Sequence, residues 1–531
     1  MRHAFVCLAV TAVAIAGVWT WLGGPVLLIP SQLGRGERLY CVSYTPFRGA
    51  QTPLDPSIVI PAAQIEDDLA RLAEVTDCVR TYSVDFGLDQ IPGIAARHGL
   101  KVMQGLWLSS NLVKSQYQIE TAVSLANKYP GTIRSVVVGN EVLLRGDMTA
   151  ADLANTIRAI KARVHVPVTY ADVWEFWLRN TDVANAVDFI TIHILPYWED
   201  VAIPARSAVA HVEAIHRQVV AAFPGKEVLI GEVGWPSAGR MREGALPSPA
   251  NQARVIQEVL ALGKRENFNV NIIEAFDQPW KRALEGTVGG HWGIFNATTR
   301  APKFAGAQAV SNHPLWLWQG GGGILFAVVM FGAVMSVRTK DTPLSLWLAA
   351  SANAFVGGAL VGWTIENIPL ESLGLDGWSR SVALAAVAMA SPVVLSMTIM
   401  RSTSLPTFSH IFGPKEYRVR DPLALFAGVI LLITMLLAFV IALGLVFDPR
   451  YRDFPFAPLT AAIVPFLMHS FMVTRPKGAR PAAETAGAGV LGLSVCYIVF
   501  NEGFANWQSL WLCAALAALA FNLVRVRGAT G

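Results

Sequence analysis

The chain has 531 residues, of which 53% are hydrophobic and only 15% are charged, against about 25% charged residues in an ordinary soluble domain. Its formal net charge of +4 is unevenly distributed: residues 37–314 carry 26 basic and 28 acidic residues, so the basic excess belongs to the apolar remainder. That excess is typical of membrane orientation. Residues 37–314 show no basic stripe with interleaved aromatic residues, which excludes nucleic acid as a partner.

The N-terminal run AFVCLAVTAVAIAGVWTWL, residues 4–22, has about the length that a transmembrane helix needs. A secretory signal peptide is the alternative, and Ala14-Ile15-Ala16 is a weak cleavage pattern for it. Because the apolar run continues through Trp19 and Trp21, we predict an uncleaved transmembrane anchor within residues 1–36.

Residues 37–314 alternate between short apolar strand patterns and amphipathic helical patterns. Near-continuous apolar strands are typical of a parallel sheet covered on both faces, and the length suits one (β/α)8 TIM barrel. A doubly wound open sheet is less favoured, because no Gly-rich phosphate loop follows the first strand. The expected strands are 39–45, 78–84, 101–108, 133–140, 166–173, 187–195, 227–233 and 270–276, with helices such as 61–76 and 149–164 between them.

Residues 315–531 read as an all-α multi-spanning transmembrane domain. Seven apolar runs lie near 316–336, 344–363, 381–400, 422–446, 455–473, 487–501 and 508–525, which makes eight spans with the first helix. Twelve of the sixteen basic residues outside 37–314 fall on one side of these spans. Cytoplasmic loops are rich in Lys and Arg, so we predict an inner (plasma) membrane protein with cytoplasmic termini and a periplasmic or extracytoplasmic domain at 37–314.

Polar residues inside the spans are few, with Asn353 and His469 the main ones. They do not make a proton relay, so an ion-coupled transporter is disfavoured. The five cysteines include no C-x-x-C pair and no zinc spacing. Cys41 and Cys78 can pair if their strands are neighbours, and two buried thiols are the alternative.

In a TIM barrel the chemistry lies at the carboxyl ends of the strands. The expected strand ends gather carboxylates, hydroxyls and aromatic rings, which together suit a carbohydrate cleft. Glu141 and Glu232 each follow an apolar strand, and glycoside chemistry commonly uses one carboxylic acid and one carboxylate. We interpret these two as the catalytic pair, with the charge of Glu232 raising the pKa of Glu141.

The segments VVVGNEVLLRG and VLIGEVGWPSAG resemble the two signature segments of glycoside hydrolase family 17, the β-1,3-glucanase and glucan transglucosylase family. RTYSVD, GIAARHGLKVMQGLWL and EAFDQPWK…HWGIF resemble its other segments in order, across residues 37–314. The resemblance implies a TIM barrel, retention of anomeric configuration, Glu141 as acid/base and Glu232 as nucleophile. It also implies that Asn140 holds the 2-hydroxyl of the reacting sugar.

The resemblance also implies further residues that contact the sugar or the nucleophile. For each of them, packing at the top of the barrel is the alternative role. Candidates to orient the nucleophile or bind sugar are Tyr82, Tyr170, His193 and Tyr197, and candidates for a stacking floor are Trp235, Phe276 and Trp292. Lys281 is a candidate ligand, or the partner of Asp277 in a structural ion pair. Where fungal members carry FDEPWK, this chain has FDQPWK, so Gln278 replaces a carboxylate. No metal and no cofactor are expected.

The leading hypothesis is a membrane-embedded retaining transglucosylase that elongates, branches or cyclises β-1,3-glucan of the envelope. A secreted enzyme would suit digestion, whereas eight spans suggest work on a glucan made at the same membrane, with a membrane glucan synthase as a candidate partner. An endo- or exo-β-1,3-glucanase is the alternative. A non-catalytic glucan-binding or export component is disfavoured because both carboxylates are present, and a nucleotide-sugar synthase is disfavoured because no nucleotide-binding domain is visible.

Overall fold

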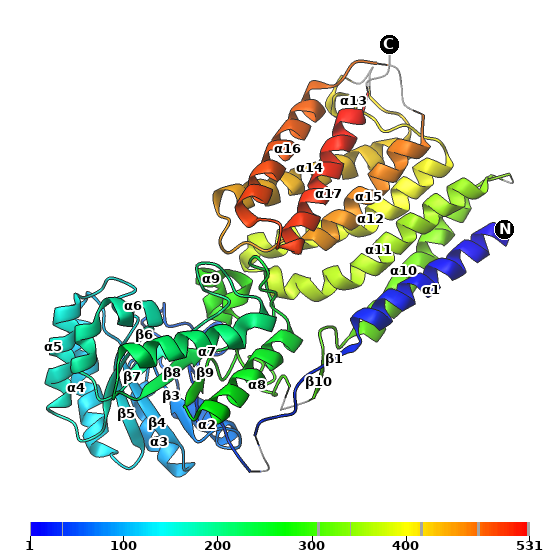
Figure 1. Cartoon of the computed structure of the whole chain (residues 1–531). Helices are drawn as coiled ribbons and strands as arrows, with labels where there is room; N and C mark the ends of the chain where they lie inside the picture. Colours follow the sequence, from blue (N-terminus) through cyan, green and yellow to red (C-terminus); the bar gives the residue numbers. More distant parts are fainter. Residues whose placement is uncertain are drawn as a thin grey trace. The chain divides into compact units, whose positions relative to one another are not determined.

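A computed structural model describes residues 2–33, 36–304, 308–339, 341–414, 418–474 and 478–527. The chain forms two compact units. One unit comprises Val26–Ala238 and Gly244–Val310, and it holds the barrel. The other comprises Met1–Pro25, Gly239–Glu243 and Ser311–Gly531, and it is helical. Figure 1 shows the strands of the first unit and the long helices of the second.

Eight parallel strands close into a barrel, which confirms the predicted TIM fold. Each strand lies inside its predicted range. In chain order they are β2 (Cys41–Ser43), β3 (Cys78–Arg80), β4 (Lys101–Leu106), β5 (Ile133–Asn140), β6 (Val168–Val173), β7 (Ile190–His193), β8 (Val228–Val233) and β9 (Val270–Ile272). The barrel closes where β2 pairs with β9. Outside it, β1 (Pro25–Leu27) pairs with β10 (Ala309–Ser311).

The helices that cover the strands bury one apolar face each. On α2, for example, Ile65, Leu69 and Leu72 are buried. Polar side chains cap three of the helix starts, with Asn111, Thr149 and Ser248 accepting from main-chain N–H groups of α4, α5 and α8. The helices are α2 (Ala62–Leu72), α3 (Ile91–Arg97), α4 (Leu112–Lys128), α5 (Ala150–Lys161), α6 (Trp174–Arg179), α7 (Ala205–Ala222), α8 (Pro249–Glu266) and α9 (Arg282–Gly289).

The barrel interior is filled from alternate strand positions, because successive side chains of a strand point to opposite faces. One layer packs Met103, Val137 and Leu229 with a disulfide between Cys41 and Cys78. The two cysteines lie on the neighbouring strands β2 and β3, with Cα atoms 4.3 Å apart, and both are fully buried. Of the two possibilities left open by the sequence, the structure has the paired one.

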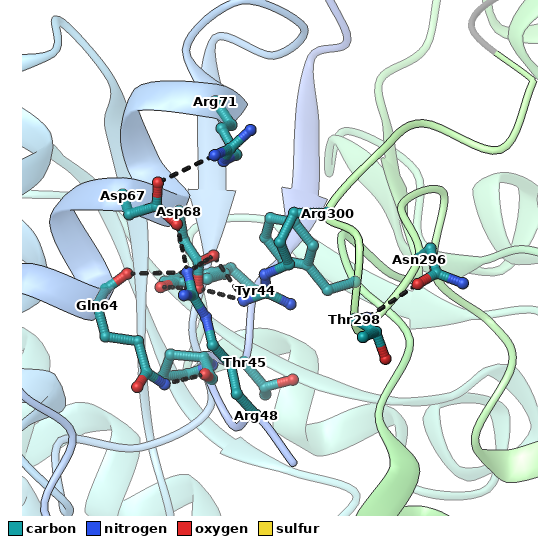
Figure 2. A network of polar contacts seen from close by, with 12 residues as sticks. Tyr44, Thr45, Arg48, Gln64, Asp67, Asp68, Arg71, Asn296, Thr298 and Arg300 are labelled. Carbon is teal, nitrogen blue, oxygen red and sulfur yellow. Dashed lines mark hydrogen bonds and ion pairs between the residues drawn. The ribbon is translucent and has the colours of Figure 1, made fainter.

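A buried ion network joins α2 to the loop that ends the barrel unit (Figure 2). Asp68 is fully buried and accepts from Nη2 of Arg48 at 2.5 Å and from Nη2 of Arg300 at 2.5 and 2.7 Å. The Tyr44 hydroxyl donates to Oδ2 of Asp68 at 3.1 Å. Burial raises the pKa of Asp68, whereas the two arginines pull it down. The network therefore ties segments that lie at opposite ends of the barrel sequence.

The helical unit contains a helix at each of the eight expected spans. Seven are long and apolar enough to cross a membrane, whereas α15 has 17 residues. The helices are α1 (Arg2–Leu22), α10 (Trp316–Val337), α11 (Leu344–Glu371), α12 (Gly374–Met400), α13 (Phe408–Phe412), α14 (Pro422–Phe447), α15 (Phe456–Met472), α16 (Ala482–Glu502) and α17 (Trp507–Arg525). Five of the basic residues behind the predicted topology lie outside the described residues: Arg35, Lys340, Lys415, Arg475 and Lys477.

Candidate active site

The carboxyl ends of β5 and β8 bring two glutamates to one mouth of the barrel. Glu141 directly follows β5, and Glu232 lies near the end of β8. One side-chain oxygen of each, and one ring nitrogen of His193, all lie within 4.8 Å of one another. Retaining glycosidases place their two carboxyl groups about 5–5.5 Å apart, whereas inverting enzymes need about 6.5–9.5 Å. The spacing of the two glutamates is therefore closer to that of retaining than of inverting enzymes.

Glu141 is held in a backbone conformation that residues other than glycine seldom adopt. Its φ is +53°, and Gly139 just before it has a φ of +85°. A Cβ atom at Gly139 would meet Cγ2 of Val142 at 2.6 Å, so that position requires glycine. Such left-handed residues cost of the order of 1 kcal/mol and are concentrated at functional sites. The strand therefore ends in a turn that carries Glu141 into the mouth.

His193, the last residue of β7, lies between the two carboxylates. Its Nδ1 is 2.8 Å from Oε1 of Glu141, and its Nε2 is 3.6 Å from Oε1 of Glu232. The imidazole is fully buried, the Glu232 side chain is 6% exposed, and the Glu141 side chain is 24% exposed. His193 therefore links the two carboxylates, and Glu141 is the more exposed of the two.

Arg80, the last residue of β3, fixes the other side of the pair from inside the barrel. Its Nη1 donates to Oε1 of Glu232 at 3.1 Å and to the carbonyl of Gly231 at 2.6 Å. Its Nη2 donates to Oδ1 of Asn140 at 2.5 Å and lies 3.3 Å from Nε2 of His193. Arg80 therefore links Asn140 to Glu232 from inside the barrel.

Tyr82 makes a second side-chain contact with Glu232. Its hydroxyl lies 2.7 Å from Oε1 of Glu232 and 2.8 Å from Oγ of Ser43, which in turn accepts from Asn271 at 2.8 Å. Burial and the charge of Glu232 raise the pKa of Tyr82 well above its ordinary value. Tyr82 therefore stays protonated and donates to Glu232, which holds one carboxylate oxygen in place.

The expectation that the pKa of Glu141 is raised by Glu232 is wrong. Burial does push this pKa upward, but the hydrogen bond from His193 and the positive charges of His193, Arg80 and Arg145 outweigh it. The pKa of Glu141 consequently lies below its usual range. The sequence interpretation counted only the neighbouring carboxylate and missed the cations that the fold places around it.

The expected ion pair between Asp277 and Lys281 is also wrong. Nζ of Lys281 pairs with Oε2 of Glu274 at 2.9 Å, and Asp277 pairs with Lys303 at 2.7 Å. Glu274 is buried, which raises its pKa to about 7 against the lowering charge of Lys281. Burial likewise raises the pKa of Glu285, which also senses the negative charges of Glu141 and Glu232. Lys281 therefore senses the negative charges of Glu274, Glu285 and Glu232.

Tyr170 is placed away from the open mouth, contrary to its expected contact with sugar. Its side chain is 1% exposed and packs against Trp177, with ring centroids 5.5 Å apart. Its hydroxyl is bonded to Asp172 and accepts from the N–H of Leu143 at 3.0 Å. Its neighbours Thr169 and Ala171 point into the barrel, so strand alternation turns Tyr170 toward the helices. Tyr170 therefore supports the turn after Glu141 rather than binding substrate.

The aromatic candidates divide into two groups. Tyr197, Trp235 and Trp292 form a buried cluster, with Tyr197 6.0 Å from Trp235 and 6.2 Å from Trp292 between ring centroids. Trp198 stacks on Trp292 and is the partly exposed member. Phe276 does not belong to this floor, because the guanidinium of Arg300 covers its ring at 3.7 Å from the centroid.

The glutamates and His193 are also the kind of group that can hold a metal ion. Two observations favour a charge-compensated acid pair instead. Arg80 already supplies a positive charge 3.1 Å from Glu232, and each ring nitrogen of His193 faces a carboxylate. A divalent cation would meet the arginine as a like charge.

The site residues that sequence reasoning missed are those inside the barrel. For Arg80 a signal exists, because a charge in the apolar run CVRTYSV indicates a buried partner. Ser43 and Asn271 had no signal of their own, because a small polar residue in a strand is common. Only the closing of β2 on β9 brings them under Tyr82.

Comparison with known proteins points to one kind of enzyme. Residues 41–293 match the family model described as the BtgE/BtgC glycoside hydrolase domain. The chain is 28% identical over 259 residues to a "Glucan 1,3-beta-glucosidase" of Candida albicans and to one of Saccharomyces cerevisiae. Each match covers 44% of this chain and 82% of the relative.

A solved structure with the same kind of title is also similar. It is the glycoside hydrolase family 17 β-1,3-glucanosyltransferase of Rhizomucor miehei, with 26% identity and a TM-score of 0.45. The match covers 50% of this chain and 96% of that one.

Proposed function

Because the barrel domain of this chain belongs to glycoside hydrolase family 17, we propose that the protein is a retaining β-glucan transglucosylase that acts on β-1,3-glucan. The observation that carries the proposal is the pair of carboxylates within 4.8 Å at one mouth, with Glu232 buried and Glu141 accessible. A buried, oriented carboxylate suits a nucleophile, and an accessible one suits exchange of protons with substrate.

In the first step Glu232 attacks the anomeric carbon while Glu141 gives its proton to the leaving oxygen. Arg80 and Tyr82 both contact Oε1 of Glu232, so Oε2 is the oxygen that attacks. Glu141 enters this step with a low pKa. A bound glucan covers its exposed edge and strips water from it, which favours the protonated form.

In the second step Glu232 is an ester and has lost its charge. Glu141 is now a carboxylate, which His193 stabilises through Nδ1. It takes the proton of the acceptor hydroxyl while that oxygen bonds to the anomeric carbon and the ester bond to Glu232 breaks, which returns Glu232 to a carboxylate and Glu141 to an acid. Transfer and hydrolysis share all of this chemistry and differ only in the acceptor, a sugar hydroxyl or water. We propose transfer because the chain also carries many apolar helices. A membrane-bound enzyme would meet glucan that is made at the same membrane.

We further propose that the chain spans the membrane, with an anchor at 1–36, the catalytic domain at 37–314 outside, and a membrane domain at 315–531. The seven long apolar helices and the uneven distribution of Lys and Arg support this placement. Fusion of alkaline phosphatase or green fluorescent protein after residue 531 tests it. Fluorescence without phosphatase activity is expected, and the reverse result contradicts the topology.

Product analysis tests the acceptor. The purified full chain is incubated with a linear β-1,3-glucan pentasaccharide, and the products are separated by mass and by linkage. Products longer or more branched than the substrate are expected. If every product is shorter and unbranched, the enzyme is a hydrolase.

Covalent trapping tests the nucleophile. A 2-deoxy-2-fluoro glucoside with an activated leaving group should label the peptide that contains Glu232, and the Glu232→Gln variant should stay unlabelled. The Glu141→Gln variant is the matched control, because an activated leaving group needs no acid and labelling should continue. Labelling of Glu232→Gln would rule out our assignment.

A further inference from the structure

One cavity of the helical unit is lined by cations without acidic counterparts. It measures about 40 Å³ and lies where α15 and α17 end. Its charged or titratable lining residues are His469, Arg525 and Arg527, and no Asp or Glu is among its described lining residues. Hydroxyl groups of Ser404 and Thr474 complete the polar part of the wall.

Among the described residues, the two arginines donate hydrogen bonds to main-chain oxygens only. Nη2 of Arg525 donates to the carbonyl of Ser470 at 3.1 Å, and Nη1 of Arg527 donates to the carbonyls of Val524 and Val526 at 2.6 and 3.1 Å. A guanidinium carries five N–H donors in a fixed fork. Most of these donors therefore have no acceptor in the described part of the fold, and Nε of Arg525 is buried without one.

The position of Arg525 is set by aromatic rings. Its guanidinium lies 4.9 Å from the ring centroid of Phe471 and 5.0 Å from that of Phe521. On the cavity wall, Oδ1 of Asn522 is buried without a hydrogen-bond partner, and Nε2 of His469 lies 2.8 Å from the carbonyl of Thr403. The two phenyl rings and the carbonyl of Ser470 hold the guanidinium of Arg525 in place before any ligand binds.

We propose that this cavity binds the phosphate of an anionic membrane lipid. Phosphate oxygens accept from arginine in the bidentate geometry that the free donors offer. A buried donor without an acceptor is costly, so a ligand oxygen at Nε of Arg525 is favoured. A zwitterionic headgroup brings its own positive charge next to Arg525 and Arg527 and binds less well.

The proposal of a lipid, rather than a free anion, rests on the proposed membrane placement. The cavity lies at the helix ends that the basic loops mark as cytoplasmic. Anionic lipids are abundant in that leaflet, and basic pockets between helices there bind lipid headgroups. The phenyl rings beside Arg525 suit the acyl chains that follow such a headgroup.

Native mass spectrometry of the full chain in detergent tests the site with defined lipids. The chain is incubated with equal amounts of phosphatidylglycerol and phosphatidylcholine, and the retained lipid is counted. One phosphatidylglycerol per chain is expected. Arg525→Gln should lower its retention about tenfold, because charge-assisted hydrogen bonds are lost. Arg401→Gln is the control, since Arg401 is exposed at the end of α12 and does not line the cavity.

Equal retention in Arg525→Gln and Arg401→Gln would show that the arginines only cap helix carbonyls, and this overturns the proposal. Displacement of the lipid by inorganic phosphate alone would mark a small-anion site and overturns it as well. If Arg525→Gln does not fold, Arg527→Gln replaces it with the same expectation. A chain that stays soluble without detergent contradicts the membrane placement itself, whereas equal retention in a detergent-dependent chain contradicts only the lipid site.

Discussion

Nη2 of Arg300 donates to both carboxylate oxygens of Asp68, at 2.5 and 2.7 Å, although 232 positions separate the two residues. Arg48 adds a third contact to the same carboxylate. Because Asp68 is fully buried, removing its charge leaves the buried Arg300 without its carboxylate partner, whereas Arg48 keeps its pair with Asp67.

Asp68→Asn should therefore destabilise the barrel by about 3–5 kcal/mol. Asp67→Asn is the control on the same helix, because Asp67 is 42% exposed in its pairs with Arg48 and Arg71. It should cost about 0–1 kcal/mol. The urea concentration at which glucan activity and near-ultraviolet circular dichroism are lost measures both. Equal losses would mean that the buried network adds no more than a surface pair.

Arg80→Lys should lower kcat/KM on glucan oligosaccharides by about a hundredfold. Lysine keeps the charge but cannot donate at once to Glu232, Gly231 and Asn140, as the fork of Arg80 does. Loss of two charge-assisted bonds is of that order. Arg163→Lys on the barrel surface, where Arg163 pairs with Glu120, should leave kcat/KM unchanged. A normal rate in Arg80→Lys would show that only charge matters at this position.

His193→Gln should move the alkaline limb of the kcat/KM profile to higher pH. The hydrogen bond and charge of His193 hold the pKa of Glu141 down. Removing them lets Glu141 keep its proton, and so act as an acid, at higher pH. A substrate with an activated leaving group needs no acid and should show no such shift. His98→Gln, which alters a surface pair with Glu66, is the control. A shift toward lower pH contradicts the account.

Glu274→Gln should flatten the dependence of stability on pH between about 4.3 and 7. The folded pKa of Glu274 is raised to about 7, and the unfolded value is about 4.3. A raised pKa means that the folded state binds the proton more tightly, so its contribution is full below pH 4.3 and is lost as pH rises toward 7.

Thermal unfolding of the full chain in detergent measures this dependence. The wild type should lose more stability than Glu274→Gln as the pH rises across that interval, because only the wild type binds this proton. If the stability of the two proteins falls equally with pH, Glu274 is not the group that binds the proton on folding.

The sequence predicted the barrel closely because each strand is a self-sufficient apolar run between helical patterns. Glu141 and Glu232 could be predicted in the same way, because a carboxylate directly after an apolar run is unusual. The carboxyl ends of parallel strands share one end of a barrel, so the two could also be placed at the same mouth. Tyr170 could also have been placed, because alternation puts it on the face opposite to Thr169 and Ala171.

Other features depend on contacts that no local pattern encodes. His193 and Arg80 both lower the pKa of Glu141. In the sequence His193 is 52 positions from Glu141, and Arg80 is 60 positions from Asn140, to which it donates. The partners of Lys281 and Asp277 were misassigned because spacing suggested the pair, whereas the turn after β9 directs one to Glu274 and the other to Lys303. Such choices are made by tertiary packing.

The disulfide between Cys41 and Cys78 has a consequence for how the protein is made. Both sulfurs lie inside the closed barrel, on the first two of its eight strands. An oxidant or a disulfide-exchange enzyme can reach them only while β9 has not yet sealed the barrel against β2. Such oxidants act outside the reducing cytosol. Oxidation should therefore precede closure of the barrel, and the closed barrel shields the bond from later reduction.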